Sequence, residues 1–263
     1  QAPANAELHI SAAGYGDSFI TVTPAQPQLN INLAPGGVER IVVAASGIHK
    51  YNLEMATPVS VLTGEELSRR TEPTIGETLK YEPGVHANYY GPVASSPIIR
   101  GLDGPRVRIL NNGLDTADVS RVGPDHAISA DAITAQQIEV LRGPATLFYG
   151  SGAIGGVVNV VDNRIPTEQV TKGEWMLQRE SVNNEKLASG SAQTFIGQTG
   201  LYADLFWRDN DDYSIPGQAE IHQDEDEDHA EGASGKVANT AATAKGFSLG
   251  SSYLLENGFV GLS

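Results

Sequence analysis

The sequence predicts an α+β domain followed by antiparallel strands that are long enough to cross a membrane. From about residue 47 to 166, short helix signals alternate with strand-like runs that Gly and Asn turns separate. After Pro166, segments of about ten residues alternate in hydropathy, as in a tilted strand that crosses a bilayer. No stretch approaches the roughly 18 apolar residues of a membrane helix. The expected fold class is therefore an α+β domain followed by antiparallel strands whose length suits a transmembrane β-barrel.

The composition restricts the function. The chain has 17 Lys plus Arg against 32 Asp plus Glu, which gives a net charge of −15. This balance disfavours nucleic acid as a partner, since nucleic acid requires basic surfaces, and it is compatible with attraction of cations. Because the chain has no cysteine, disulfides and thiolate metal sites are excluded. No nucleophile is ordered beside a base, so we expect no enzyme and no catalytic cofactor.

Residues 1–38 precede the α+β region and read as short strands. The runs are "ELHIS", "SFITVT" and "QLNINLAP", followed by a flexible break at "APGG". We expect the tail of a small β domain plus a linker, and we assign it no function. The chain begins at Gln1 without Met or a basic signal region, and it stops inside an alternating run. Both ends indicate a piece of a larger protein.

The α+β region, residues 47–166, contains two helix signals and several strand signals. "TGEELSRR" opens like a helix capped by Thr63, and "TIGETLKYEPG" looks like a short helix ended by Pro83 and Gly84. "PIIRGL", "RVRILNNG" and "QIEVLRG" are strand-like. "ATLFY" can form one or two helical turns after Pro144, and "VVNVV" is β-branched and strand-like.

The glycines in "LFYGSGAIGGVVNVV" have the spacing of a dinucleotide-binding fingerprint, G-x-G-x-x-G, at Gly150, Gly152 and Gly155. That fingerprint needs a strand before the glycines and a helix after them, because the helix N-terminus holds the phosphate. Here a helical turn precedes the glycines and a strand follows. We therefore expect Gly150, Gly152, Gly155 and Gly156 to serve turning and close backbone packing instead.

The strands after residue 166 have two distinct faces. In "LYADLFWR", Leu201, Ala203, Leu205 and Trp207 share one face, while Tyr202, Asp204, Phe206 and Arg208 share the other. In "FSLGSSYLLE", Phe247, Leu249, Tyr253 and Leu255 lie together with Ser251. A soluble antiparallel sheet alternates in the same way, so the pattern alone fits both a membrane wall and a soluble sheet.

Several motifs, in order, resemble the TonB-dependent outer-membrane receptors. These are "ERIVVAAS", "TPVSVLTGEEL", "IGETLKYEPGV", "PIIRGLDGPRVRILNNG" and "IEVLRGPATLFYGSGAIGGVVNVV", over roughly residues 39–166. The resemblance implies a plug domain at 47–166 inside a barrel of 22 strands in the bacterial outer membrane, in contact with lipid. Residues 167–263 would supply only its first four or five strands. The motif residues it assigns to the plug structure are Arg100, Gly101, Arg142, Gly143, Pro144 and the four glycines above.

The segment 39–46 resembles a TonB box, which an energy-transducing protein of the TonB type grips from the periplasm. Its residues Glu39, Arg40, Ile41, Val42 and Val43 would bind that partner, because an extended run can add as a strand to an exposed sheet edge. An ordinary linker strand is the alternative.

The cargo predicted from the sequence is zinc or a similar divalent ion. Asp125 and His126 are adjacent, and a carboxylate beside an imidazole can begin a Zn²⁺ site, although a solvated loop is the alternative. The stretch from "PDHAISADAIT" to "VVDNRIP" is especially similar to the zinc-uptake branch of the family, whose members carry this Asp-His pair as zinc ligands. That resemblance implies that Asp125 and His126 bind the transported zinc.

The stretch "IHQDEDEDHAEG" is a second cation signal, with His222, Asp228 and His229 as candidate ligands. A solvated acidic loop is the alternative. Tyr89 and Tyr90 in "HANYYGPVASS" favour a different cargo, because they can stack on haem or an aromatic siderophore. The rival functions are therefore a haem or ferric-siderophore receptor of the same build and, in another class, a soluble metal-scavenging module.

Overall fold

The computed structural model describes residues 7–10, 18–21, 41–42, 50–51, 59–123, 126, 128, 130–219 and 234–263. Within these ranges, no helix is long and apolar enough to cross a membrane. Among the described residues, four short antiparallel pairs lie outside the two main sheets, and three of them come before β8 in the chain. These three are β1 (Glu7–Ile10) with β2 (Ser18–Thr21), β3 (Ile41–Val42) with β4 (Lys50–Tyr51), and β6 (Val85–Ala87) with β7 (Pro97–Ile99).

The plug is built on a mixed five-stranded sheet. Its strand order is β5 (Val59–Thr63), β10 (Gln137–Leu141), β11 (Gly156–Val161), β8 (Val107–Asn111) and β9 (Leu114–Asp115). β10 lies antiparallel to both β5 and β11, whereas β11 lies parallel to β8. Central strands of this kind are buried on both faces, which explains the continuous β-branched run "VVNVV".

Two short helices cover one face of this sheet. α1 (Gly64–Arg70) and α2 (Ile75–Leu79) form where the sequence predicts helices, although α2 ends before Pro83 and Gly84. Thr74 caps α2, because its side chain accepts a hydrogen bond from the Glu77 amide at 3.2 Å. Thr63 stands at the N-cap of α1, but its hydroxyl donates to the Gln136 carbonyl at 2.9 Å instead. It therefore ties the helix start to the sheet.

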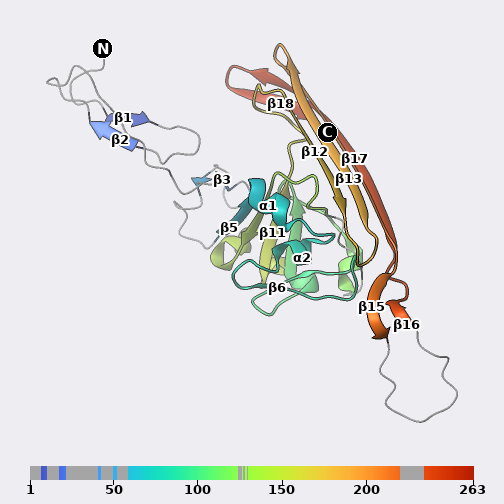
Figure 1. Cartoon of the computed structure of the whole chain (residues 1–263). Coiled ribbons are helices and arrows are strands. Elements are labelled where there is room, and N and C mark those ends of the chain that lie inside the picture. The colour runs from blue at the N-terminus through green and yellow to red at the C-terminus, as the bar shows by residue number, and fades with distance from the viewer. Residues whose placement is uncertain are drawn as a thin grey trace, which may run out of the picture.

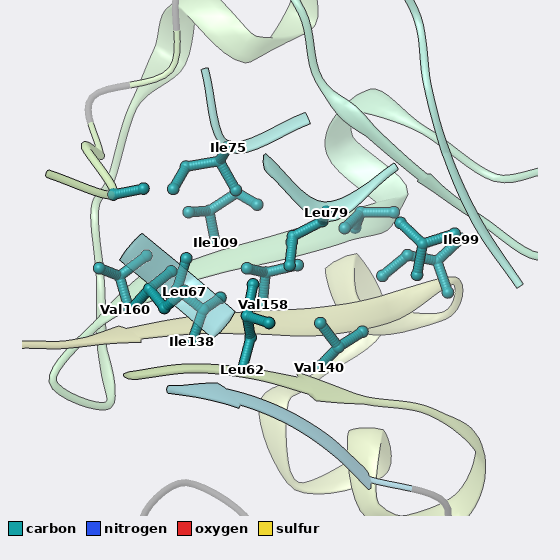
Figure 2. Close-up of a cluster of buried hydrophobic side chains, with 13 residues drawn as sticks. Leu62, Leu67, Ile75, Leu79, Ile99, Ile109, Ile138, Val140, Val158 and Val160 are labelled. Carbon is teal, nitrogen blue, oxygen red and sulfur yellow. The ribbon is translucent and has the colours of Figure 1, made fainter. Parts of the chain in front are cut away.

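The hydrophobic core lies between these helices and the sheet (Figure 2). Leu62 and Ile138 come from the sheet and Leu67, Ile75 and Leu79 from the helices, and all five are at most 3% exposed. A smaller cluster on the opposite face packs under the 3-10 helices η4 (Gly143–Tyr149) and η5 (Ser151–Ala153). Close packing on both faces fixes the sheet as the rigid part of the plug. Two further 3-10 turns, η2 (Gly104–Arg106) and η3 (Val119–Val122), flank β8.

A second five-stranded sheet, here called the wall, is antiparallel throughout. Its order is β12 (Lys172–Arg179), β13 (Lys186–Ile196), β14 (Thr199–Asn210), β17 (Ala242–Leu255) and β18 (Gly258–Leu262). The long strands run side by side along one flank of the plug (Figure 1). The small hairpin of β15 (Tyr213–Gln218) and β16 (Ser234–Val237) projects from one end. The predicted α+β domain followed by antiparallel barrel strands is confirmed.

The wall has an apolar outer face and a polar inner face. Trp175 of β12, Leu205 of β14 and Phe247 of β17 lie in one cross-strand row that passes through Gly190 of β13, and they are 79%, 61% and 78% exposed. On the other face of β14, Asp204 and Arg208 are buried. β14 has 12 residues, or roughly 40 Å at about 3.3 Å per residue, which is enough to cross a hydrocarbon layer at a tilt.

Candidate functional site

The metal ligands predicted from the sequence lie mostly outside the described residues. This holds for Asp125, His222, Asp228 and His229. His126 is described and exposed. Among the residues that the structure covers, no group of three or more His, Asp or Glu side chains is arranged to hold a metal ion. The assignment of Asp125 and His126 to zinc therefore stays a prediction.

The predicted aromatic loop is exposed on the plug between β6 and β7. Tyr89 and Tyr90 are 55% and 59% exposed, and the backbone amide of Tyr90 donates to the Ala94 carbonyl at 3.0 Å. Partial burial raises the pKa of Tyr89, and the nearby Tyr213 of β15 adds to the effect.

The candidate partner-binding segment is described only at two residues. Ile41 and Val42 form β3 and pair with Tyr51 and Lys50 of β4, while Glu39, Arg40 and Val43 lie outside the described residues. A strand in a two-stranded pair has one unpaired edge, which is the edge that strand addition uses. The role of residues 39–46 stays a prediction.

The four glycines of the 147–161 segment lie where the chain turns from 3-10 helix into β11. Gly150 has a φ of 80°, which favours glycine. A Cβ on Gly155 would lie 2.9 Å from the Leu102 Cβ, and one on Gly156 would lie 2.7 Å from Ile99 Cδ1. At Gly152 the nearest atom would be the Pro105 carbonyl oxygen, at 3.3 Å. Because β11 follows, this segment lacks the helix N-terminus that a pyrophosphate requires.

The two Arg-Gly motifs hold the turns around the plug sheet. Arg100 and Gly101 follow β7 with φ values of 53° and 77°, and the Arg100 amide donates to the Gly84 carbonyl at 3.3 Å. Arg142 donates to the Pro83 carbonyl and to the Ser60 hydroxyl. Gly143 has a φ of 76° and Pro144 occupies the first turn of η4, so this motif converts β10 into helix.

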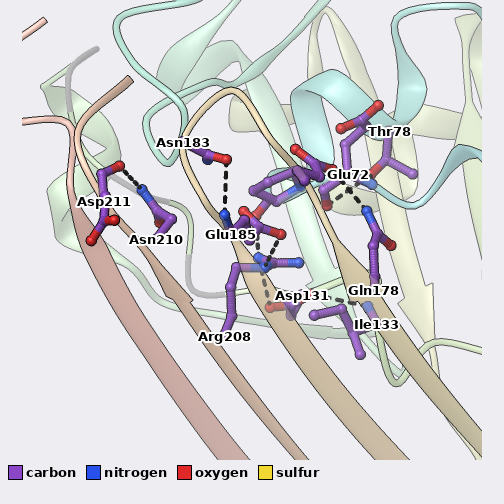
Figure 3. Close-up of polar contacts among 12 residues, drawn as sticks. Glu72, Thr78, Asp131, Ile133, Gln178, Asn183, Glu185, Arg208, Asn210 and Asp211 are labelled. Carbon is purple, nitrogen blue, oxygen red and sulfur yellow. Dashed lines mark hydrogen bonds and ion pairs between the residues drawn. The ribbon is translucent and has the colours of Figure 1, made fainter. Parts of the chain in front are cut away.

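A buried ionic cluster joins the plug to the wall (Figure 3). Arg208 of β14 donates from Nη1 to the Pro73 carbonyl at 3.1 Å, and the same nitrogen lies 3.8 Å from Asp131 Oδ2. Its Nε lies 3.4 Å from Glu185 Oε1 in the turn between β12 and β13. The side chains of Arg208 and Glu185 are only 4% and 2% exposed. Burial at this depth strengthens every charge interaction in the cluster.

Carboxylates outnumber the cation in this cluster. Burial raises the pKa of Asp131, and the Arg208 guanidinium opposes the shift. Burial also raises the pKa of Glu72, and the nearby Glu180 carboxylate adds to it. For Glu185, burial again raises the pKa against the influence of Arg208. Each carboxylate is therefore protonated more easily than in water.

The segment 162–168 links plug to wall and packs against the inner face of the wall. The Ser252 hydroxyl of β17 donates to the Pro166 carbonyl. Gln193 of β13 donates from Nε2 to the carbonyls of Glu168 and Val170, at 3.0 and 3.1 Å. A side chain on Gly250 would overlap the Arg164 carbonyl oxygen, so only glycine allows this approach.

Sequence reasoning placed Arg208 on the polar face of its strand but did not identify the cluster. The available signal was a pair of charged residues, Asp204 and Arg208, on the face opposite an apolar one. Their partners Pro73 and Asp131 lie far away in the sequence, so strand periodicity alone could not find them.

Residues 52–157 match the family model described as the TonB-dependent Receptor Plug Domain. Solved structures similar to this chain include the pyoverdine outer membrane receptor FpvA of Pseudomonas aeruginosa PAO1. It has a TM-score of 0.60 and 16% identity over 82% of this chain and 28% of that chain. The ferric enterobactin receptor PfeA of the same species gives 0.55 and 20%, over 78% of this chain and 32% of that chain.

The siderophore receptor PirA of Pseudomonas aeruginosa is also similar, with a TM-score of 0.51 and 22% identity over 78% of this chain and 34% of that chain. The chain thus spans about a third of the length of these solved receptors. At such identities the likeness shows the fold: a plug followed by part of a barrel. No zinc receptor is among these three structures.

Proposed function

Because residues 52–157 are a TonB-dependent receptor plug domain followed by strands that match part of a receptor barrel, we propose that the chain is part of an active importer. Receptors of this family are transporters rather than enzymes, and they reside in the bacterial outer membrane, which is the location of this chain. The observation that supports import best is the contact of the plug with the polar inner face of the wall, through Arg208, which reaches Pro73 and Asp131, and through segment 162–168.

The domain limits that fit this proposal are those of the sequence analysis. We propose the tail of a small N-terminal β domain plus linker for residues 1–38, the TonB box for 39–46, the plug for 47–166 and the first barrel strands for 167–263. A TonB-type protein would bind residues 39–46 by strand addition. Lipid would contact the apolar outer face of the wall, where Trp175 and Phe247 are exposed.

A ferric siderophore is the first substrate candidate. Solved receptors with this fold are described as receptors for enterobactin, pyoverdine and other siderophores. Tyr89 and Tyr90 support this class, because they expose two aromatic rings on one plug loop near Tyr213. Aromatic rings of a catecholate ligand can stack on such side chains.

Zinc is the second candidate, favoured by the exposed His126 beside Asp125 and by the acidic tract at 221–232. Imidazole with carboxylate suits Zn²⁺, whereas hard cations prefer all-oxygen sites. The cation would be cargo, not a cofactor.

Calorimetry on the full-length receptor distinguishes the two candidates, with ferric enterobactin and zinc chloride as separate probes. If the cargo is a siderophore, the Tyr89→Ala, Tyr90→Ala variant loses affinity for ferric enterobactin at least about tenfold, since stacking contributes about 1 kcal/mol per pair. If the cargo is zinc, the Asp125→Ala, His126→Ala variant loses zinc binding instead. Tyr81→Ala is the control, because Tyr81 is exposed beside Lys80 and outside the aromatic loop. If the unaltered receptor binds neither ferric enterobactin nor zinc, both assignments are refuted.

A further inference from the structure

Arg208 is a wall residue that contacts two plug segments at once. Its guanidinium donates to Pro73, between α1 and α2, and faces Asp131, in the loop before β10. These two segments are distant in the sequence, and neither belongs to the covalent link at 162–168. A single buried side chain therefore fixes how the helical layer and the loop before β10 lie against the wall.

The charges around Arg208 do not balance. Asp131 comes from the plug and Glu185 from the turn after β12, and both lie within 4 Å of the guanidinium. Glu72, beside Pro73, is close enough for Arg208 and Glu180 to influence its pKa. The other groups acting on Glu72 are Glu77 of α2 and Lys80, which follows that helix. Without Arg208, carboxylates of plug and wall would face one another with little compensation.

We propose that Arg208 is a positioning residue for the plug: its charge neutralises carboxylates of the plug and the wall, and so holds the α1–α2 connection and residues 130–136 against β14. The structural part of this inference stands without the transport activity, and only its consequence for uptake rests on the proposed function.

The alternative is that Arg208 acts only by filling space. The two roles differ in their response to charge, because removing one partner of a buried ion pair is strongly unfavourable, whereas removing both partners is often neutral. A Gln at position 208 fills most of the volume and leaves the carboxylates. Replacing Asp131 and Glu185 by their amides in the same chain removes the repulsion without adding volume.

The repulsion should also depend on pH. Burial raises the pKa of Asp131 and Glu72 in the docked plug, so the docked state binds protons more readily than the undocked state. Docking of a receptor that lacks the Arg208 charge is thus favoured as the pH falls from 7 toward these raised values. This stabilisation of the docked state by protonation is lost as the pH rises through the raised pKa values of the two carboxyl groups.

Hydrogen exchange of the full-length receptor in detergent, without substrate or TonB, tests this inference. The variants are Arg208→Gln, Arg208→Lys, and Arg208→Gln combined with Asp131→Asn and Glu185→Gln. Lys245→Gln is the matched control, because Lys245 is exposed on the outer face of the neighbouring strand β17. The informative peptides cover residues 71–80 and 130–136, and β13 with β14 reports whether the wall itself is intact.

We expect Arg208→Gln to speed exchange in both plug peptides at least about tenfold at pH 7, and less at pH 5, with the wall unchanged. Arg208→Lys and the charge-balanced triple variant should restore slow exchange, and Lys245→Gln should resemble the unaltered receptor. Unchanged exchange in Arg208→Gln, or equal exchange in Arg208→Gln and the triple variant, would overturn the proposal. A receptor that shows the expected exchange but imports nothing would instead refute the transport function alone.

Discussion

The side-chain amide of Asn159 donates to the Glu139 carboxylate at 3.0 Å, across two neighbouring strands of the plug sheet, and neither side chain is exposed. Gln137 donates to the other carboxylate oxygen at 2.9 Å. The Asn159 side-chain oxygen Oδ1 in turn accepts from the Gly113 backbone amide at 2.8 Å. A network with all these partners present fixes the register of β10, β11 and the turn after β8.

We predict that Asn159→Leu destabilises the plug by about 3 kcal/mol, because the substitution leaves a buried carboxylate oxygen and a backbone amide without these partners. Exchange of the β10 and β11 amides in the full-length receptor measures the loss. Glu139→Gln is the control, since it keeps an acceptor opposite Asn159 and should cost less than half as much. Equal losses in the two variants would contradict the role assigned to the network.

Gly250→Ala should displace the linker at 162–168 from the wall. The added methyl group would overlap the Arg164 carbonyl, and overpacking of this kind costs about 1–3 kcal/mol. Limited proteolysis of the full-length receptor should then cut within 162–168. Gly190→Ala is a suitable comparison, because its nearest atom, the Glu174 carbonyl oxygen, would lie 3.8 Å from the new Cβ. If the linker resists proteolysis equally in Gly250→Ala and Gly190→Ala, it can move away from the added methyl group at little cost.

Leu205→Arg should impair insertion of the full-length receptor into the outer membrane. Leu205 lies in the apolar row with Trp175 and Phe247, and a charge at the centre of a lipid-facing surface costs about 2–4 kcal/mol. Thr243→Arg, at the end of the wall beside Asp209, should be tolerated. Heat-modifiable migration on gels measures how much of each variant is folded in the membrane. Equal folded yields of Leu205→Arg and Thr243→Arg would show that the apolar row does not face lipid.

Ile41→Pro should abolish import by the full-length receptor while leaving substrate binding at the cell surface intact. Proline removes a backbone donor from the segment proposed to add as a strand to TonB. Uptake and surface binding of the same labelled substrate separate the two steps, and Gly37→Pro, which lies outside 39–46, serves as the comparison. Normal uptake by Ile41→Pro would exclude 39–46 as the TonB box.

Strand and helix positions in the plug could be predicted because local signals sufficed. Thr74 before "IGETL" indicates the start of α2, and the β-branched run at 157–161 indicates β11; the structure has both elements at these positions. The role of Thr63 could not be predicted, because its hydroxyl bonds to Gln136 across the sheet rather than to its own helix. The 3-10 geometry of "ATLFY" also depends on packing over Leu141 and Val157, which the local sequence does not specify.

For the candidate sites too, features with a local sequence pattern could be predicted, whereas contacts between distant residues could not. The outer face of the wall followed from alternation, and exposed Leu201 and Leu205 agree with it. The contacts of Arg208 with Pro73 and Asp131 required the fold, because they join residues separated by most of the plug sequence. The buried state of Glu139 was not predictable for a related reason. A charged residue in "QIEVL" is typical of a half-exposed strand, and the hydrogen bonds from Asn159 on the neighbouring strand and from Gln137 make its burial favourable.

The position of β5 at the edge of the plug sheet determines how the plug responds to tension. Among the described strands, β5 is the first strand of the sheet in the chain and pairs with β10 alone, so it can detach without breaking the pairs between β10, β11 and β8. A pull directed along β5 loads its hydrogen bonds together, whereas a pull across the sheet breaks them one after another. The direction of an applied force, rather than its size alone, would therefore decide whether the N-terminal part of the plug peels away while the remaining strands keep their fold.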